Sequence, residues 1–324
     1  MIKFLSTLIS LLFVLSGCKK EDNNDPDGEL FFTVCPVDTA YISEASPLGN
    51  VNPPGHTFPS NHIGFYIRGG DFIPVYAMAG GTITSLYYNE WSDDYRIEIS
   101  YSESVMYYLD HICNITSLVR EGAALLPGDL LGYAETGQGA FDIGVVNYSA
   151  DNIFIVPERY HEFYLYYDDP YEYFTDSIRE ILELKNPRIG EPKGGKVDYD
   201  TDGTLAGNWF LEGTPLTWEA SSYIYGANQL AFVYDMYNAS TLMIACGGTL
   251  EAAPFAYRVV GNSPDPVDVT ISSGIIIYEL EAFFFDCTLL VQLIENRKLK
   301  AEVFRDEKPE DIPGFTAQAK IYVR

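Results

Sequence analysis

Short apolar runs, interrupted by Gly, Pro, Asn or Asp, make up most of the 324-residue chain. Within these runs apolar and polar side chains alternate, or β-branched and aromatic residues cluster, and both patterns are typical of strands. The clearest examples in the first half of the chain are residues 81–88, 95–102, 104–112 and 139–146. The pattern predicts a mainly β protein.

One segment, residues 176–185, has the pattern of a helix instead. It carries an apolar stripe at helical spacing, Ser177 and Glu180 have the spacing of a capping box, and Asn186-Pro187 ends the helix. A stretch dense in aromatic residues precedes it, and a turn-rich stretch follows. We therefore expect an aromatic and helical connector at residues 161–195, between two domains.

The second domain, residues 196–324, is predicted to be a small β-barrel or sandwich. Its expected strands are residues 205–211, 229–234, 240–246, 257–260, 274–281, 288–295, 298–304 and 317–323. Gly207-Asn208-Trp209 near its start and the late hairpin around residues 295–297 look lipocalin-like. That likeness implies one alternative function, a carrier of a small apolar ligand inside the barrel.

The N-terminal residues have the features of an export signal. Met1-Ile2-Lys3 supplies a positive charge, and the apolar run at residues 4–15 is shorter than the about 20 residues that a membrane-spanning helix needs. The run ends in Leu15-Ser16-Gly17-Cys18, which resembles the bacterial lipobox. The resemblance implies a signal peptide at residues 1–17, cleavage before Cys18, and lipid attached to Cys18.

The segment at residues 18–30 is polar and acidic, and its composition predicts a disordered tether. An acidic run directly after a lipidated cysteine resembles the surface-export signal of Bacteroidetes lipoproteins. This implies an outer-membrane lipoprotein on the cell surface of a Gram-negative bacterium. The formal net charge of −26 argues against nucleic acid, or an anionic membrane surface, as a partner. We therefore expect contact with the membrane through the lipid alone.

Four cysteines follow Cys18, and their spacing matches no zinc motif. An exported protein can form disulfide bonds, although spacing does not fix the pairing. The economical pairing keeps each bond within one domain and joins Cys35 to Cys113 and Cys246 to Cys287. Buried free thiols are the alternative.

Five short segments follow one another in order between residues 48 and 146. They are Pro53-Pro54-Gly55-His56 leading to His62-Ile63-Gly64-Phe65-Tyr66, the hairpin at residues 73–83, Tyr107-Tyr108-Leu109-Asp110-His111-Ile112, the turn at residues 127–133, and Gly139-Ala140-Phe141-Asp142-Ile143-Gly144-Val145. In this order and spacing they resemble the lysostaphin/LytM family of zinc peptidases, which cut peptidoglycan cross-bridges. The resemblance implies an antiparallel β-sheet domain of that type at residues 31–160.

The resemblance also marks the positions of the family's active site, and there the chain departs from the family. In active members the His and Asp of an HxxxD motif and the second His of an HxH motif hold zinc, and two further histidines act on the water and the oxyanion. His62 stands at the first ligand, and His111 at one of the two further histidines. Tyr66 replaces the Asp ligand, Ala140 the first His of HxH, and Asp142 the second. A neutral phenol is a poor zinc ligand, and alanine can neither bind a metal nor move a proton.

Two alternatives follow for these residues. In one, His62, His111 and Asp142 together hold zinc or iron, with His56 as an added ligand, and the protein is an active metallohydrolase in which His111 is catalytic. In the other, the histidines hydrogen-bond to Asp142 or Tyr66 without a metal. We expect the second alternative, which makes the domain a pseudoenzyme that binds peptidoglycan, a glycan or another envelope protein.

Overall fold

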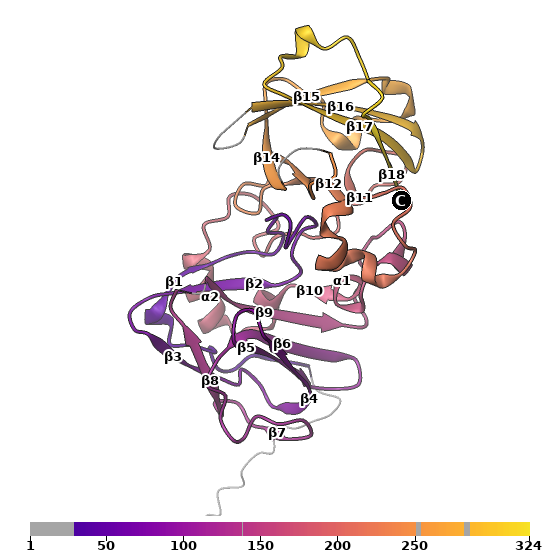
Figure 1. Ribbon diagram of the computed structural model, residues 1–324. Coiled ribbons are helices and arrows are strands. Elements are labelled where there is room, and N and C mark those ends of the chain that lie inside the picture. The colour runs from indigo at the N-terminus through magenta and orange to yellow at the C-terminus, as the bar shows by residue number, and fades with distance from the viewer. Residues whose placement is uncertain (1–28, 138, 251–253, 282–285) are drawn as a thin grey trace, which may run out of the picture.

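The computed structural model describes residues 29–137, 139–250, 254–281 and 286–324. The expected signal peptide, Cys18 and the tether up to residue 28 lie outside these residues. The described chain is mainly β, as predicted, with an antiparallel sheet in the first half and a closed barrel in the second (Figure 1). Within the described residues, no helix is long and apolar enough to cross a membrane.

The sheet of the first half has eight strands, in the order β1-β2-β9-β6-β5-β4-β7 with β10 paired to β9. They are β1 (Ile42–Ala45), β2 (Ile63–Ile67), β4 (Gly81–Asn89), β5 (Asp94–Ser100), β6 (Val105–Ile112), β7 (Ala124–Leu125), β9 (Ala140–Asn147) and β10 (Tyr167–Asp168). β3 (Phe72–Tyr76) and β8 (Leu130–Glu135) form a separate pair. Because side chains alternate between the two faces of a strand, the central strands bury Phe65, Leu109 and Phe141 on one face. The neighbouring positions on the other face carry the candidate site.

The barrel closes because each of its strands pairs with the next and the last pairs with the first. The strands are β11 (Gly207–Leu211), β12 (Gln229–Tyr234), β13 (Leu242–Cys246), β14 (Phe255–Val260), β15 (Ile276–Glu281), β16 (Asp286–Glu295), β17 (Lys298–Arg305) and β18 (Lys320–Val323). Trp209, Tyr257, Tyr278 and Tyr322 are all fully buried in one apolar cluster with the inward-facing aliphatic side chains. Over the described residues these side chains fill the barrel interior, which counts against the carrier alternative.

Arg324 stabilises one end of the barrel from inside. Its guanidinium lies 3.9 Å from the centre of the Trp209 ring and donates to the backbone oxygens of Leu205, Ala206 and Asn208. The Trp209 indole donates to the Leu205 oxygen at 2.9 Å. One buried cation thus ties the last strand to the segment that leads into the first strand of the barrel.

The barrel and the sheet share one apolar core. Phe58, in the loop before β2, packs edge-on against Phe210 of β11 with ring centres 5.1 Å apart. Ala231 and Val233, which face outward on β12, belong to the same cluster as the buried side chains of the sheet. The Thr57 hydroxyl donates to the Gly226 oxygen at 3.1 Å. The barrel therefore packs directly against the loop that carries His56.

The predicted helix is present as α2 (Asp176–Lys185), preceded by the single turn α1 (Glu162–Leu165). The capping box expected at Ser177 is wrong, because the N-cap is Thr175, two residues earlier, and its side chain makes no capping bond. Asp176 in the first turn instead accepts from Arg179 at 2.6 Å. Short 3-10 turns lie at Thr39–Tyr41, Pro157–Arg159, Pro170–Tyr173, Trp218–Ser221, Tyr223–Asn228, Pro266–Asp268, Ile271–Ser273 and Pro309–Asp311.

The predicted disulfide pairing is wrong. Cys35, Cys113, Cys246 and Cys287 all lie within the described residues, and none of them forms a disulfide. The Cys113 thiol donates to the Tyr133 oxygen at 3.1 Å instead. Cys246 lies on β13 and Cys287 on β16, with two strands between them in the barrel order. Burial raises the pKa of Cys35 to about 11, so this thiol stays protonated at neutral pH.

Candidate functional site

The candidate residues lie in one row on the face of the sheet opposite Phe65, Leu109 and Phe141. Asp142 on β9 pairs with Gly64 on β2 and with Asp110 on β6. Paired residues of antiparallel strands have their side chains on the same face. The row therefore brings together residues far apart in the sequence, such as His62 and Asp142, which are 80 positions apart (142 minus 62).

Asp142 lies between two imidazoles. Its Oδ2 atom is 3.5 Å from Nε2 of His62 and 3.5 Å from Nε2 of His111. The side chains of His62, Asp142 and His111 are 13%, 15% and 32% exposed. The structure thus places together the three residues that the sequence suggested as ligands, with Asp142 in the middle.

His111 is held by a second carboxylate that the sequence analysis missed. Its Nδ1 atom lies 2.7 Å from Oδ2 of Asp94, a residue with no solvent exposure. Burial opposes a charge on His111, but the hydrogen bonds to Asp142 and Asp94 and the charges of Asp142 and Asp110 raise its pKa to about 10. At neutral pH His111 is therefore an imidazolium with both nitrogens directed at carboxylates.

Arg96 on β5 neutralises Asp110, the neighbour of His111. The Asp110 Oδ2 atom accepts from Nε of Arg96 at 2.8 Å and from its Nη2 at 2.5 Å. Burial opposes ionisation of Asp110, but the Arg96 charge lowers the pKa of this carboxyl below its usual value. The guanidinium also lies 4.7 Å from the centre of the Tyr108 ring. This ion pair extends the polar row from β9 to β5.

His56 and His62 form the opposite end of the row. Their ring centres are 5.2 Å apart in an edge-on arrangement. Burial lowers the pKa of both rings, that of His56 to about 4. Both histidines are therefore neutral at pH 7, unlike His111.

Tyr66, at the position of the family's Asp ligand, hydrogen-bonds to the second domain. It pairs with Ala140 on β9 and Glu44 on β1, and its side chain hydrogen-bonds to Tyr237 from the barrel. The Tyr237 hydroxyl donates to Oε1 of Glu44 at 2.6 Å. Burial raises the pKa of Tyr66, so it stays a neutral phenol. The position of the family's carboxylate ligand is used here to dock the barrel onto the sheet.

The family's zinc does not fit the residues at these positions. Tyr66 is a neutral phenol bonded elsewhere, and Ala140 offers no donor atom. Among the described residues, the only three His, Cys, Asp or Glu side chains with ligand atoms all within 4.8 Å of one another are Asp94, Asp110 and His111. His62 is not part of that group.

The aromatic connector covers the face beside this row. Phe163 of α1 stacks on Tyr108 with ring centres 5.3 Å apart and planes 14° apart. The Tyr108 ring lies so close over Gly144 that a Cβ atom there would overlap it. The Asn61 amide donates to the Phe163 oxygen at 2.6 Å. His161 caps α1 and contacts Trp218.

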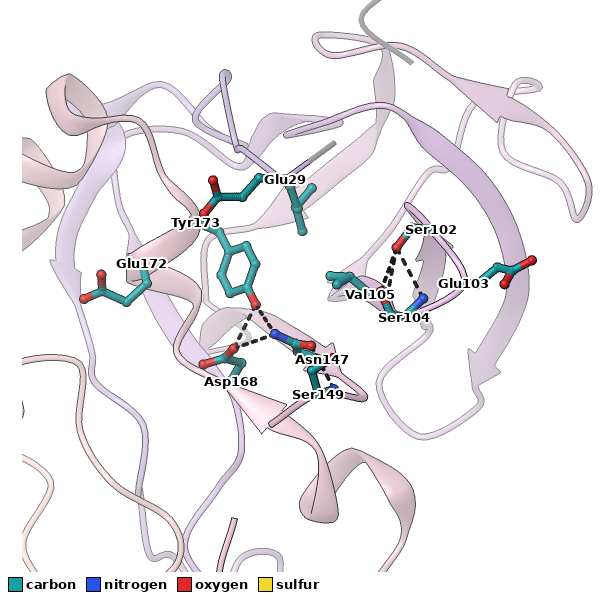
Figure 2. Close-up of a pocket in the computed structure, with 11 residues that line it drawn as sticks. Glu29, Ser102, Glu103, Ser104, Val105, Asn147, Ser149, Asp168, Glu172 and Tyr173 are labelled. Atoms are coloured by element: carbon teal, nitrogen blue, oxygen red, sulfur yellow. Dashed lines mark hydrogen bonds between the residues drawn. The ribbon is translucent and has the colours of Figure 1, made fainter. Parts of the chain in front are cut away.

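A cavity of about 1140 Å³ lies away from the histidines, at the ends of β6, β9 and β10 (Figure 2). Its carboxylates include Asp168, which accepts from Tyr173 at 2.8 Å and from Asn147 at 3.1 Å. Its lining contains none of the candidate residues. The cavity therefore does not extend the candidate site.

No protein-family model matches the chain, and no curated protein matches it. Similar solved structures include Helicobacter pylori Csd3, with 14% sequence identity and a TM-score of 0.32 over 48% of this chain and 40% of that chain. A zinc-containing peptidase from Vibrio cholerae has 22% identity and a TM-score of 0.31 over 37% of this chain and 38% of that chain. The solution structure of lysostaphin has 9% identity and a TM-score of 0.27 over 87% of this chain and 90% of that chain. The chain spans about two-fifths of the length of the first two proteins, and TM-scores this low decide neither fold nor function.

Proposed function

We propose that the sheet domain is a peptidase-like module that binds the peptide part of peptidoglycan without cutting it. The main supporting observation concerns the positions at which the chain departs from the peptidase family. Tyr66 docks the barrel, Ala140 is inert, and Asp142 is shared between His62 and His111. A catalytic zinc needs three protein ligands and an open position for water, and of the family's three ligand positions only those of His62 and Asp142 keep a side chain suited to zinc.

We propose that the peptide lies over the more exposed end of the polar row, toward β5 and β4. The exposed fraction of the side chains rises from 13% at His62 to 32% at His111. Tyr87 on β4 is exposed and pairs with Arg96, which puts its ring on the same face as the polar row. At the other end the barrel covers the row through Tyr237 and the loop around Gly226. A ligand would therefore approach over Arg96 and Tyr87.

We further propose that the protein lies on the cell surface of a Gram-negative bacterium. Lipid on Cys18 would anchor it in the outer membrane, and the acidic tether would let the sheet domain reach envelope polymers. The lipobox-like residues and the acidic segment that follows them support this location. If the ligand is instead a glycan or another envelope protein, the lipid anchor stays the same and only the molecule bound by the sheet domain differs.

Replacing Tyr87 by Ala is expected to weaken binding to purified peptidoglycan about tenfold, because an exposed aromatic ring in a binding groove contributes on the order of 1–2 kcal/mol. Co-sedimentation with insoluble peptidoglycan measures this. Tyr88→Ala is the matched control, since Tyr88 is also an exposed tyrosine of β4 but its side chain points to the opposite face of the sheet. Equal binding by both variants and the wild type would place the ligand elsewhere, and absence of wild-type binding would exclude peptidoglycan.

A further inference from the structure

Asp94, Asp110 and His111 form a compact group of ligand atoms beside the row described above. Each offers one atom, and these atoms all lie within 4.8 Å of one another. We infer that these three residues form a site for a first-row divalent transition-metal ion. Of the three, only His111 stands at a functional position of the peptidase family, and it is not a zinc ligand there. The inferred site is independent of the peptide-binding proposal.

One carboxylate oxygen of Asp94 makes no hydrogen bond within the described residues and supports this inference. The residue has no solvent exposure, and its Oδ2 contacts Nδ1 of His111 at 2.7 Å. Its Oδ1 is buried and has no hydrogen-bond partner among the described residues. Buried carboxylate oxygens are costly unless something compensates them, and each such atom in a folded protein calls for an explanation. A metal ion held by Asp94 and His111 would supply that compensation.

The charges around the group also favour a divalent cation. Asp94, Asp110 and Asp142 lie around His111, and Arg96 is the one permanent cation in contact with them. Once a metal ion has displaced the extra proton of His111, three carboxylates and one guanidinium leave two negative charges, which a divalent ion balances. Arg96 uses Oδ2 of Asp110, whereas Oδ1 accepts only from the His111 backbone, at 3.0 Å. Arg96 thus fixes the orientation of the Asp110 carboxylate without binding the metal itself. Oδ1 of Asp110 remains available to the metal.

The backbone conformation of His111 positions its imidazole beside the carboxylates of Asp94 and Asp110. His111 has a φ of 66°, in the left-handed region that residues other than glycine rarely adopt. Its ring is 32% exposed, which gives an ion a route to the buried carboxylates. Two carboxylates and one imidazole are a ligand set for zinc or manganese, whereas Mg²⁺ prefers oxygen ligands and water. A bound ion would join the start of β5 to the end of β6.

The test is a titration of metal-stripped protein with Zn²⁺, followed by calorimetry, with Mg²⁺ as the comparison ion. The wild type is expected to bind one Zn²⁺ per chain more tightly than Mg²⁺. Asp94→Asn, which keeps the shape of the side chain, is expected to weaken Zn²⁺ binding at least tenfold. His62→Ala is expected to leave it within about threefold, because His62 is outside the group of ligands.

Two results would overturn the inference. One is wild-type protein that binds no Zn²⁺. The other is binding that is lost in His62→Ala and kept in Asp94→Asn, which would put the ion at the family's position and count against the proposed function as well. Should Asp94→Asn fail to fold, the absorption spectrum of the Co²⁺-loaded wild type, compared with that of His62→Ala, decides the matter. Identical d–d bands in both proteins support the inferred site, and a band pattern changed by His62→Ala contradicts it.

Discussion

Arg324→Met is expected to lower the free energy of unfolding by about 3–4 kcal/mol, one of the two largest effects of a single substitution that we predict. The guanidinium is buried over Trp209 and donates to several backbone oxygens, which methionine cannot replace. Those oxygens would lose a charged donor, and hydrogen bonds to charged groups contribute about 1.5–3 kcal/mol each. Urea unfolding followed by tryptophan fluorescence measures the loss.

The matched control for this prediction is Arg297→Met. Arg297 pairs with Asp202 on the surface, where both side chains are more than half exposed. Exposed ion pairs contribute about 0–1 kcal/mol, so this variant is expected to unfold almost as the wild type does. If Arg324→Met and Arg297→Met destabilise the protein equally, Arg324 does not hold the barrel closed.

Gly144→Ala is the other substitution with a large expected effect, a loss of about 2–4 kcal/mol. The added methyl group would overlap the ring of Tyr108, and that ring cannot move freely because Phe163 stacks on its other side. The variant is therefore expected to displace α1 from the sheet. Thermal unfolding measures the loss of stability, and near-ultraviolet circular dichroism reports the disturbed aromatic stack.

A double variant separates this overlap from the ordinary cost of replacing glycine. In a Tyr108→Leu background the same Gly144→Ala change is expected to cost less than about 1 kcal/mol, because the overlapping ring is gone. Gly55→Ala is the control for the methyl group itself, since a Cβ atom at this position would make only an ordinary contact. Additive losses in the double variant would show that Tyr108 is not the obstacle.

The strands could be predicted from the sequence because alternation of apolar and polar residues is a local signal. Residues 229–234 were expected as a strand and form β12 with the same limits. The helix at Asp176–Lys185 was likewise predicted, but its capping box was wrong because Thr175 and not Ser177 lies at the helix start. The disulfide pairing was wrong because economy within a domain does not determine where thiols point.

The candidate site was predicted only in part, because the rest depends on strand register. The resemblance to the peptidase family supplied His62, His111 and Asp142. Asp94 was missed because it meets His111 only through the pairing of β5 with β6, where the register shifts. Tyr237 was missed for a different reason, because it reaches Glu44 from the other half of the chain. No sequence spacing encodes either contact.

If the peptidase-like domain binds peptidoglycan without cutting it, purified peptidoglycan incubated with the protein and Zn²⁺ should release no soluble peptide. His62→Ala is the negative comparison, and a triple variant with Tyr66→Asp, Ala140→His and Asp142→His restores the family's residues. We expect no release above the protein-free blank for the wild type or for His62→Ala, and any gain of release only in the triple variant. Release of soluble peptide by the wild type that is abolished in His62→Ala would contradict the proposed non-catalytic function.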